Sequence, residues 1–296
     1  MNRILTAGRG AFVLLERAGR TGVGECAPLP GRSPDRLEED LAALASASSV
    51  DDVPLSLPAA RFALETALLD LAAQERGVSV AEILGRAPVG ELAASAIVPL
   101  GGSSTAATWK VKIGRGDQDG EIAALGVMRR GLRLDVNRAW SREQAARALP
   151  RLVRLEPAWV EEPVSAADLL DMGPQPVPIA LDESLLDQPD ESAAALAAGL
   201  VHAVVLKPAL LGGHAACLDW AARARRAGAV PVTSHLMDGP VGLAAAIELA
   251  LAIAEPGDPA AGLGAHDGLA AWPALAVPQL RGQRLISHRP GLGVRP

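Results

Sequence analysis

Two kinds of segment alternate from about residue 92 onward: short runs of β-forming residues and longer segments rich in Ala and Leu. Strands that alternate with helices favour parallel βαβ units. About eight such units in roughly 200 residues fit a closed barrel better than an open sheet. We therefore predict an α/β fold with a modified (β/α)8-type (TIM-like) barrel, whose strands are 95–100, 108–113, 132–136, 159–161, 178–181, 203–207, 230–234 and, more weakly, 262–264.

The residues before this alternation have a different pattern and predict a small N-terminal α+β capping domain, 1–90. The barrel domain is expected over 91–270 and carries the catalytic strand ends. We expect the C-terminal segment, 271–296, to pack back on the capping domain.

Local signals predict the elements of the capping domain. A strand at 11–16 is followed by a turn at 20–22 and a second strand that ends near Glu25. Ser33-Pro34 favours the start of a helix through Leu44, because Ser is a good N-cap and Pro suits the first helical position. An apolar face at helical spacing predicts a second helix over 60–72, which Gly77 ends.

Two barrel helices carry recognisable start signals. Ser141 and Gln144 have the spacing of a capping box, and Ser165 has the position of an N-cap.

Composition narrows the class of protein. Hydrophobic residues make up 49% and charged residues 21%, which is typical of a globular chain. A net charge of −6 argues against non-specific binding to nucleic acid, and the absence of Tyr leaves little for base stacking. The stretch 241–254 is too short to span a membrane and contains Glu248. Cys26 and Cys217 have no metal-type spacing and suit a reducing compartment, so we expect a cytoplasmic protein; its oligomeric state stays open.

Charged residues are expected to be rare inside apolar strands, so the exceptions are informative. They occur where successive runs end, and the intervals between the later ones each match one strand–helix unit. In a parallel barrel these ends form the catalytic face. We therefore expect one rim to carry Lys110, Lys112, Asp135, Glu161, Asp182 and Lys207.

The three carboxylates predict a metal site. Three converging negative charges repel one another, and a hard divalent cation that prefers oxygen ligands relieves this repulsion. Mg²⁺ fits best, with Mn²⁺ as a substitute, and the lack of a Cys or His cluster disfavours zinc. Such a cation would act as a Lewis acid toward a substrate oxygen.

The lysines predict acid–base chemistry. Lys110 and Lys112 point to the same face of a strand, while Trp109, Val111 and Ile113 form the alternating apolar set. Two close ammonium groups favour loss of a proton from one of them, which suits a general base. The alternative is a solvated edge strand. Lys207 ends an apolar run and is expected to oppose Lys112, or else to pair with a carboxylate for structure alone.

The order K-x-K, Asp, Glu-Glu-Pro, Asp-Glu-Ser and a later Lys resembles the enolase superfamily, in its muconate-lactonizing-type subgroup. The resemblance covers almost the whole chain. More narrowly it is similar to the o-succinylbenzoate synthase family of menaquinone biosynthesis. The segments that carry it are 24–31 (GECAPLPG), 132–140 (LRLDVNRAW), 180–184 (ALDES) and 204–208 (VVLKP).

The resemblance implies a role for each matching residue. Asp135, Glu161 and Asp182 would be Mg²⁺ ligands, Lys112 the base, Lys110 its neighbour and Lys207 the residue opposite. The residues expected to contact a small carboxylate substrate are Arg133, Asn137, Ser234 and Gly264.

The implied activity is that of a carbon–oxygen lyase (hydro-lyase). It would be the syn dehydration of 2-succinyl-6-hydroxy-2,4-cyclohexadiene-1-carboxylate to 2-succinylbenzoate. Lys112 would remove the proton alpha to the carboxylate, giving an enediolate intermediate, and would then help the hydroxyl to leave.

The chain departs from the family pattern at 233–240, where a Ser-rich run with a Glu is common and this chain reads TSHLMDGP. This region usually touches the distal end of the substrate. Alternatives therefore stay open: an N-succinylamino acid racemase or dipeptide epimerase, a Schiff-base lysine enzyme, and a non-catalytic barrel. His235 is a further acid–base candidate. Glu162 and Glu183 neighbour the proposed ligands but are expected to point the other way on the strand, in roles that support the ligands or the fold.

Overall fold

The structure is a computed structural model that describes residues 3–7, 10–27, 36–85, 87–129, 131–272 and 274–296. The chain divides into two compact units. The first comprises Met1–Ala93, Lys207–Asp219 and Thr233–Pro296, and the second comprises Ala94–Leu206 and Trp220–Val232.

The second unit is built on a parallel sheet whose seven strands follow one another in chain order. This is the arrangement that successive βαβ units produce. Seven of the predicted strands are confirmed, most of them with narrower bounds, and the one predicted at 95–100 is reduced to two residues. They are β5 (Ala96–Ile97), β6 (Trp109–Lys112), β7 (Arg133–Asp135), β8 (Trp159–Glu161), β9 (Ile179–Leu181), β10 (Ala203–Leu206) and β11 (Val230–Thr233).

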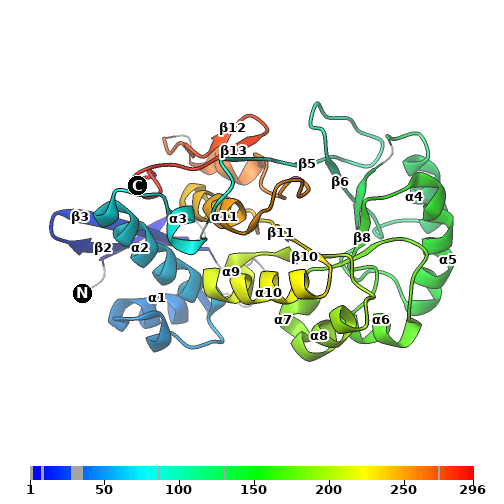
Figure 1. Ribbon diagram of the computed structural model, residues 1–296, viewed down its shortest axis with the longest axis horizontal. Helices are drawn as coiled ribbons and strands as arrows, with labels where there is room; N and C mark the ends of the chain where they lie inside the picture. Colours follow the sequence, from blue (N-terminus) through cyan, green and yellow to red (C-terminus); the bar gives the residue numbers. More distant parts are fainter. Residues whose placement is uncertain (1–2, 8–9, 28–35, 86, 130, 273) are drawn as a thin grey trace. The chain divides into compact units, whose positions relative to one another are not determined.

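Helices connect these strands, and Figure 1 shows α4, α5 and α6 along one side of β6 and β8. Both predicted N-caps are confirmed, since Ser141 and Ser165 accept hydrogen bonds from the backbone N–H groups of Gln144 and Asp168. The connecting helices are α4 (Gln118–Leu125), α5 (Arg142–Leu152), the 3₁₀ turn η2 (Val153–Leu155), α6 (Ala166–Met172), α7 (Ser184–Asp187), α8 (Pro189–Ala197), α9 (Pro208–Leu211) and α10 (His214–Arg226).

The predicted run at 262–264 contributes only a bridge. Gly262 pairs in parallel with Ser234, and its N–H donates to the Thr233 carbonyl at 2.8 Å. The neighbouring Ala261 N–H donates to the Ala93 carbonyl at 2.9 Å. This segment is therefore no full strand, and the fold class is the expected α/β barrel type.

The N-terminal part of the first unit is a three-stranded antiparallel sheet packed against a helix. Figure 1 shows α2 beside β2 and β3. Helix α2 ends as predicted at Gly77, which has a φ of 69° and donates to the Ala73 carbonyl. The elements are β1 (Arg3–Ala7), β2 (Gly10–Arg17), β3 (Arg20–Cys26), α1 (Arg36–Ser46), η1 (Val50–Asp52), α2 (Pro58–Arg76) and α3 (Val80–Leu84).

The predicted turn at 20–22 is wrong, because the hairpin turns at Ala18 and Gly19, whose φ angles are 48° and 74°. Gly22 lies within β3 and serves close packing instead, since a Cβ there would collide with the Ala67 carbonyl of α2. Strand β1 was not predicted. The expected helix start at Ser33-Pro34 lies outside the described residues.

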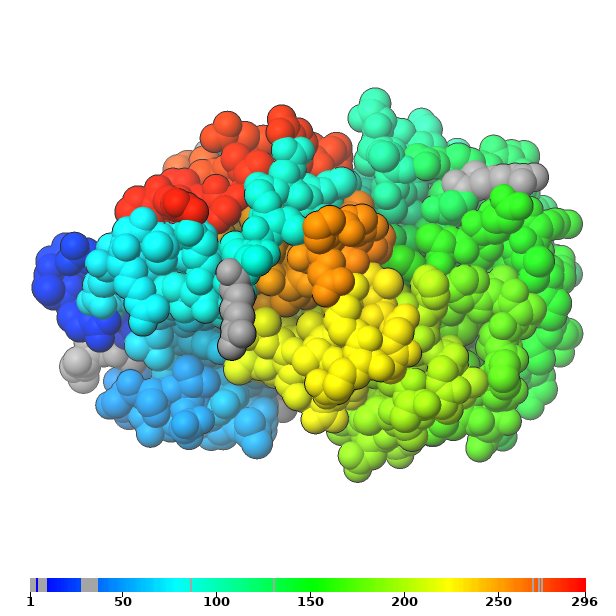
Figure 2. Space-filling model, viewed as in Figure 1, coloured from blue at the N-terminus to red at the C-terminus, as the bar shows by residue number. Residues whose placement is uncertain are grey.

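The C-terminal residues contact the N-terminal part of the same unit. The Leu292 N–H donates to the buried Asp70 carboxylate of α2 at 2.8 Å, and Arg295 pairs with the same carboxylate at 3.0 Å. In Figure 2 the red C-terminal residues lie against the cyan residues of this unit. The remaining elements are β4 (Glu91–Ala93), α11 (Pro240–Ile253), η3 (Asp267–Ala271), β12 (Leu280–Arg281) and β13 (Arg284–Ile286), and β4 pairs with β13.

Among the described residues, no helix combines the length and the apolar character that crossing a membrane requires.

Candidate active site

Strand register brings the polar strand-end residues of the second unit together. Lys112 is the direct partner of Asp135 on β7, and Asp135 is the direct partner of Glu161 on β8. Because the strands are parallel, all three residues lie at the same edge of the sheet.

Charge pairing links these residues. The Lys110 Nζ lies 2.9 Å from Asp135 Oδ2 and 2.5 Å from Glu161 Oε1. The Lys112 Nζ lies 3.4 Å from Asp135 Oδ2 and donates to Asn137 Oδ1 at 3.0 Å. The side chain of Lys110 is only 12% exposed, so the solvated-edge interpretation of this strand is wrong. Val111, which separates the two lysines in the sequence, is buried on the opposite face of the strand, as the alternation of strand side chains requires.

Asp182 follows β9 and is also buried. Its position is two residues beyond Ala180, which packs with Trp159 in one apolar cluster. Trp159 is in turn two residues before Glu161. Since strand side chains alternate between the two faces, Asp182 belongs to the same face as Glu161.

The predicted ligands are carboxylates, and carboxylate oxygens are the type of ligand that a hard divalent cation prefers. Asp135, Glu161 and Asp182 are three buried carboxylates on neighbouring strands, and the first two already share one positive centre, the Lys110 ammonium. The described residues nevertheless contain no group of three or more acidic, His or Cys side chains at the mutual spacing of a formed metal centre. The assignment of these carboxylates as ligands thus stays a prediction.

Arg133 and Asn137 are placed by the same strand. The buried Arg133 guanidinium lies over the Trp159 ring, 4.2 Å from its centroid. Burial lowers the pKa of Arg133 to about 10, so the side chain keeps its charge at neutral pH beside Glu161. Asn137 has a φ of 51° and its N–H donates to Asp135 Oδ1 at 3.2 Å. Their predicted contact with substrate is not tested by these positions.

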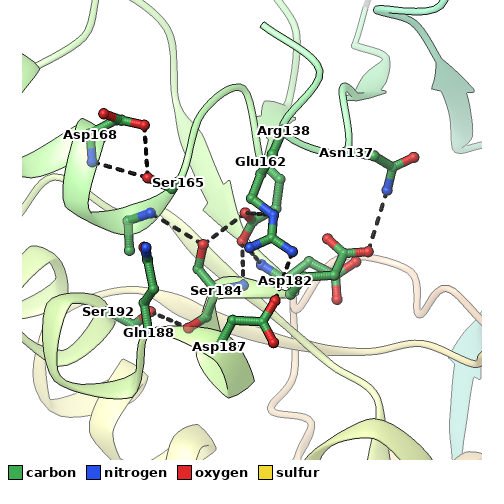
Figure 3. A network of polar contacts seen from close by, with 12 residues as sticks. Asn137, Arg138, Glu162, Ser165, Asp168, Asp182, Ser184, Asp187, Gln188 and Ser192 are labelled. Carbon is green, nitrogen blue, oxygen red and sulfur yellow. Dashed lines mark hydrogen bonds and ion pairs between the residues drawn. The ribbon is translucent and has the colours of Figure 1, made fainter. Parts of the chain in front are cut away.

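Glu162 is central to a polar network next to these residues (Figure 3). Its carboxylate accepts hydrogen bonds from the Asp182 N–H at 2.6 Å and from the Ser184 N–H at 3.0 Å. Burial raises the pKa of Glu162 to about 7, and these hydrogen bonds oppose the rise. Sequence reasoning expected this side chain to point the other way from the ligands and to support them or the fold. Nothing in the local sequence identified the Asp182 N–H as its partner.

Three residues of the first unit were also predicted to take part. Lys207 follows β10 directly and is 7% exposed, at the start of α9. The Ser234 hydroxyl donates to the Gly262 carbonyl at 3.1 Å, and Gly264 is buried. The opposition of Lys207 and Lys112, which belong to different units, stays a prediction.

Sequence reasoning missed two buried acids of the first unit, Asp238 and Glu25. Burial raises the pKa of Asp238 to about 6, and the positive charge of Lys207 opposes this rise. Glu25 accepts hydrogen bonds from the N–H groups of Gly239, Val241 and Gly242, where α11 begins. Glu25 lies in a segment that carries the family resemblance and Asp238 in the segment that departs from it, and nothing in the local sequence links residue 25 to residue 238.

His235 is held by local contacts. Its Nδ1 accepts a hydrogen bond from the Met237 N–H at 3.0 Å, and its ring lies 4.3 Å from that of His266. Burial lowers the pKa of His266. An acid–base role for His235 stays a prediction.

Comparison with known proteins places this site in a family. Residues 93–296 match the family described as "Enolase C-terminal domain-like", so the chain belongs to that family. The o-succinylbenzoate synthase of Yersinia enterocolitica is 32% identical over 268 residues, which cover 81% of this chain and 78% of that protein.

Solved structures agree on the fold. The muconate lactonizing enzyme from Pseudomonas putida matches with a TM-score of 0.80 at 21% identity, over 100% of this chain and 95% of that one. The dipeptide epimerase from Enterococcus faecalis V583 matches with a TM-score of 0.79 at 22% identity, over 99% and 98%. Fold and family thus define an enzyme of the enolase superfamily. Within it, the chain is similar in sequence to the o-succinylbenzoate synthases and, at 30% identity over 192 residues (62% of this chain and 50% of that protein), to muconate cycloisomerase 1 of Rhodococcus opacus.

Proposed function

We propose that the protein is an o-succinylbenzoate synthase. The reaction is the Mg²⁺-dependent syn dehydration of 2-succinyl-6-hydroxy-2,4-cyclohexadiene-1-carboxylate to 2-succinylbenzoate. Sequence similarity to the Yersinia enterocolitica synthase supports this substrate, because the match covers most of both chains.

One observation carries the chemical part of the proposal. The Lys112 ammonium stands beside Asp135, in a cluster where Lys110 bridges Asp135 and Glu161. A lysine beside several carboxylates at the carboxyl ends of parallel strands suits removal of a proton next to a substrate carboxylate.

In this proposal Asp135, Glu161 and Asp182 would hold the Mg²⁺. When bound, the cation would supply Lewis-acid stabilisation of the negative charge that develops on the substrate carboxylate. Mn²⁺, which also takes oxygen ligands, would substitute.

The lysines would move the protons. As a neutral amine, Lys112 takes the proton alpha to the carboxylate. The same Lys112 then returns that proton to the hydroxyl as its C–O bond breaks, so the lost proton and hydroxyl leave as one water molecule. Lys110 keeps its positive charge next to the carboxylates. Lys112, whose side chain is 36% exposed, can reach a ligand from this edge of the sheet.

A test separates dehydration from the epimerase and racemase chemistry of related barrels. The purified protein is incubated with Mg²⁺ in deuterated water, once with the cyclohexadiene substrate and once with N-succinylamino acids and dipeptides. We expect the cyclohexadiene substrate to be converted to 2-succinylbenzoate, and this conversion is measured through the absorbance of the product. Rapid deuterium incorporation at the alpha carbon of the amino acids, with no dehydration, would instead assign a racemase or epimerase.

A further inference from the structure

Glu162 connects two of the proposed metal ligands through the protein backbone. It follows Glu161 directly, and its own side chain is fully buried. Its Oε1 accepts the Asp182 N–H at 2.6 Å and the Ser184 N–H at 3.0 Å, while its Oε2 accepts the Ser184 hydroxyl at 2.8 Å (Figure 3). The turn after β9 is therefore tied to the end of β8 by a single carboxylate.

The backbone of Glu162 is held from the other side as well. Its carbonyl accepts the Arg138 N–H at 2.7 Å, which ties it to the end of β7. The Arg138 Nε lies 3.6 Å from Glu162 Oε2. Both residues adopt the left-handed conformation, with φ angles of 57° and 45°, which non-glycine residues rarely do. Such a conformation persists where the surrounding contacts hold it.

This arrangement sets the direction of the Asp182 side chain. The position of an N–H group fixes the peptide plane, and the peptide plane helps to fix the Cα–Cβ direction of the same residue. Mg²⁺ requires nearly ideal octahedral geometry at short distances, so a carboxylate ligand must be aimed accurately. Outer residues that orient the ligands are a common device of metal sites.

We propose that Glu162 is a positioning residue, whose carboxylate holds the Asp182 backbone so that the Asp182 side chain keeps the direction needed to bind the divalent cation. This inference rests on the proposed function, because it assumes that Asp182 is a ligand. It assigns the role to the reach of the Glu162 side chain and not to its charge.

Two substitutions separate reach from charge. Glu162→Asp keeps the charge but shortens the side chain by one methylene. The shorter carboxylate cannot accept the Asp182 N–H unless the Asp182 backbone moves toward it. Glu162→Gln keeps the length and a carbonyl oxygen that can accept both N–H groups. The matched control is Asp168→Asn, which alters the cap of α6 in the same network, where Ser165 donates to Asp168 at 2.8 Å without touching Asp182.

The readout is the dissociation constant of Mn²⁺ in the substrate-free protein, from electron paramagnetic resonance of free Mn²⁺, with circular dichroism to verify folding. We expect Glu162→Asp to raise this constant about 10- to 100-fold, Glu162→Gln to stay within about threefold of the wild type, and Asp168→Asn to leave it unchanged. Equal binding by Glu162→Asp and wild type would overturn the inference. So would a loss in Glu162→Gln as large as in Glu162→Asp, because charge would then be responsible.

Ser184→Ala keeps the test decisive if Glu162→Asp fails to fold. It removes the hydroxyl that donates to Glu162 Oε2 and that also accepts the Ala166 N–H at 3.2 Å, while both backbone bonds to Glu162 Oε1 stay available. We expect the Mn²⁺ constant to rise about threefold; no change would count against the inference. Mn²⁺ binding by the wild type separates failure of the proposed metal site from failure of the positioning role of Glu162. If it does not bind Mn²⁺, the proposed metal site is wrong, whereas normal binding by the wild type and by every variant would refute only the positioning role.

Discussion

The Lys112 ammonium lies 3.4 Å from the Asp135 carboxylate because the two residues are direct partners on neighbouring parallel strands. Register alone thus brings the proposed base to the proposed metal site.

The first prediction tests this base. Lys112→Ala should lower kcat by about 10²- to 10⁴-fold, the usual contribution of a general base, as measured by steady-state dehydration.

The fold should survive this change, because the Lys112 side chain is partly exposed and its loss leaves no buried cavity. Arg142→Ala is the control, since Arg142 is an exposed residue of α5 that pairs with Asp171, and its kcat should stay within about twofold. Substantial turnover by Lys112→Ala would assign the proton transfer to another group.

A second prediction concerns the metal. Asp182→Asn removes one negative ligand, so the Mg²⁺ concentration for half-maximal activity should rise about tenfold or more, with activity partly restored at high Mg²⁺. Asp187→Asn is the control, because Asp187 pairs with Arg138 at 2.9 Å in the same network and carries no ligand role. An unchanged Mg²⁺ dependence of Asp182→Asn would remove Asp182 from the ligand set.

A third prediction concerns packing in the first unit. Gly24 lies on β3 where a Cβ would collide with the Ala63 carbonyl of α2, and neither backbone can easily yield. Gly24→Ala should therefore lower the free energy of unfolding by about 3 kcal/mol or more, measured by urea denaturation. Gly90→Ala is the matched control, since no atom lies within 4 Å of the added Cβ, and its effect should stay within about 0.5 kcal/mol. Equal stability of the two variants would contradict this packing.

A fourth prediction uses His214, whose Nε2 lies 3.1 Å from the Thr66 hydroxyl. Burial lowers its pKa from 6.5 to about 3. Below pH 6.5 the unfolded chain gains a proton at His214 that the folded protein does not, so the free energy of unfolding falls as the pH drops toward 3. The variant His214→Gln has no titrating group at this position, so this pH-dependent loss of stability is absent from it.

The wild type should therefore lose roughly 2 kcal/mol more than His214→Gln between pH 7.5 and pH 5, by denaturant unfolding at each pH. The other four histidines are common to both proteins and cancel in this comparison. A difference between the two proteins that does not change with pH would show that His214 takes up its proton in the folded state.

Much of the barrel could be predicted because its signals are local. The seven strand runs, the N-caps at Ser141 and Ser165 and the C-cap at Gly77 each depend on residues that are near one another in sequence. The hairpin turn could not be assigned in this way. A glycine at position 22 suggests a turn, but it is there because α2 packs closely on β3, and that contact joins distant parts of the chain.

By itself, then, the sequence determined the order of the seven barrel strands and the polar residues at their ends, since periodicity and spacing are properties of neighbouring residues. Only the tertiary structure decided that Lys110 bridges Asp135 and Glu161, that Glu162 holds the Asp182 backbone, and that Glu25 caps α11. These contacts depend on strand register and on side-chain direction across the fold, which arise when distant segments pack together.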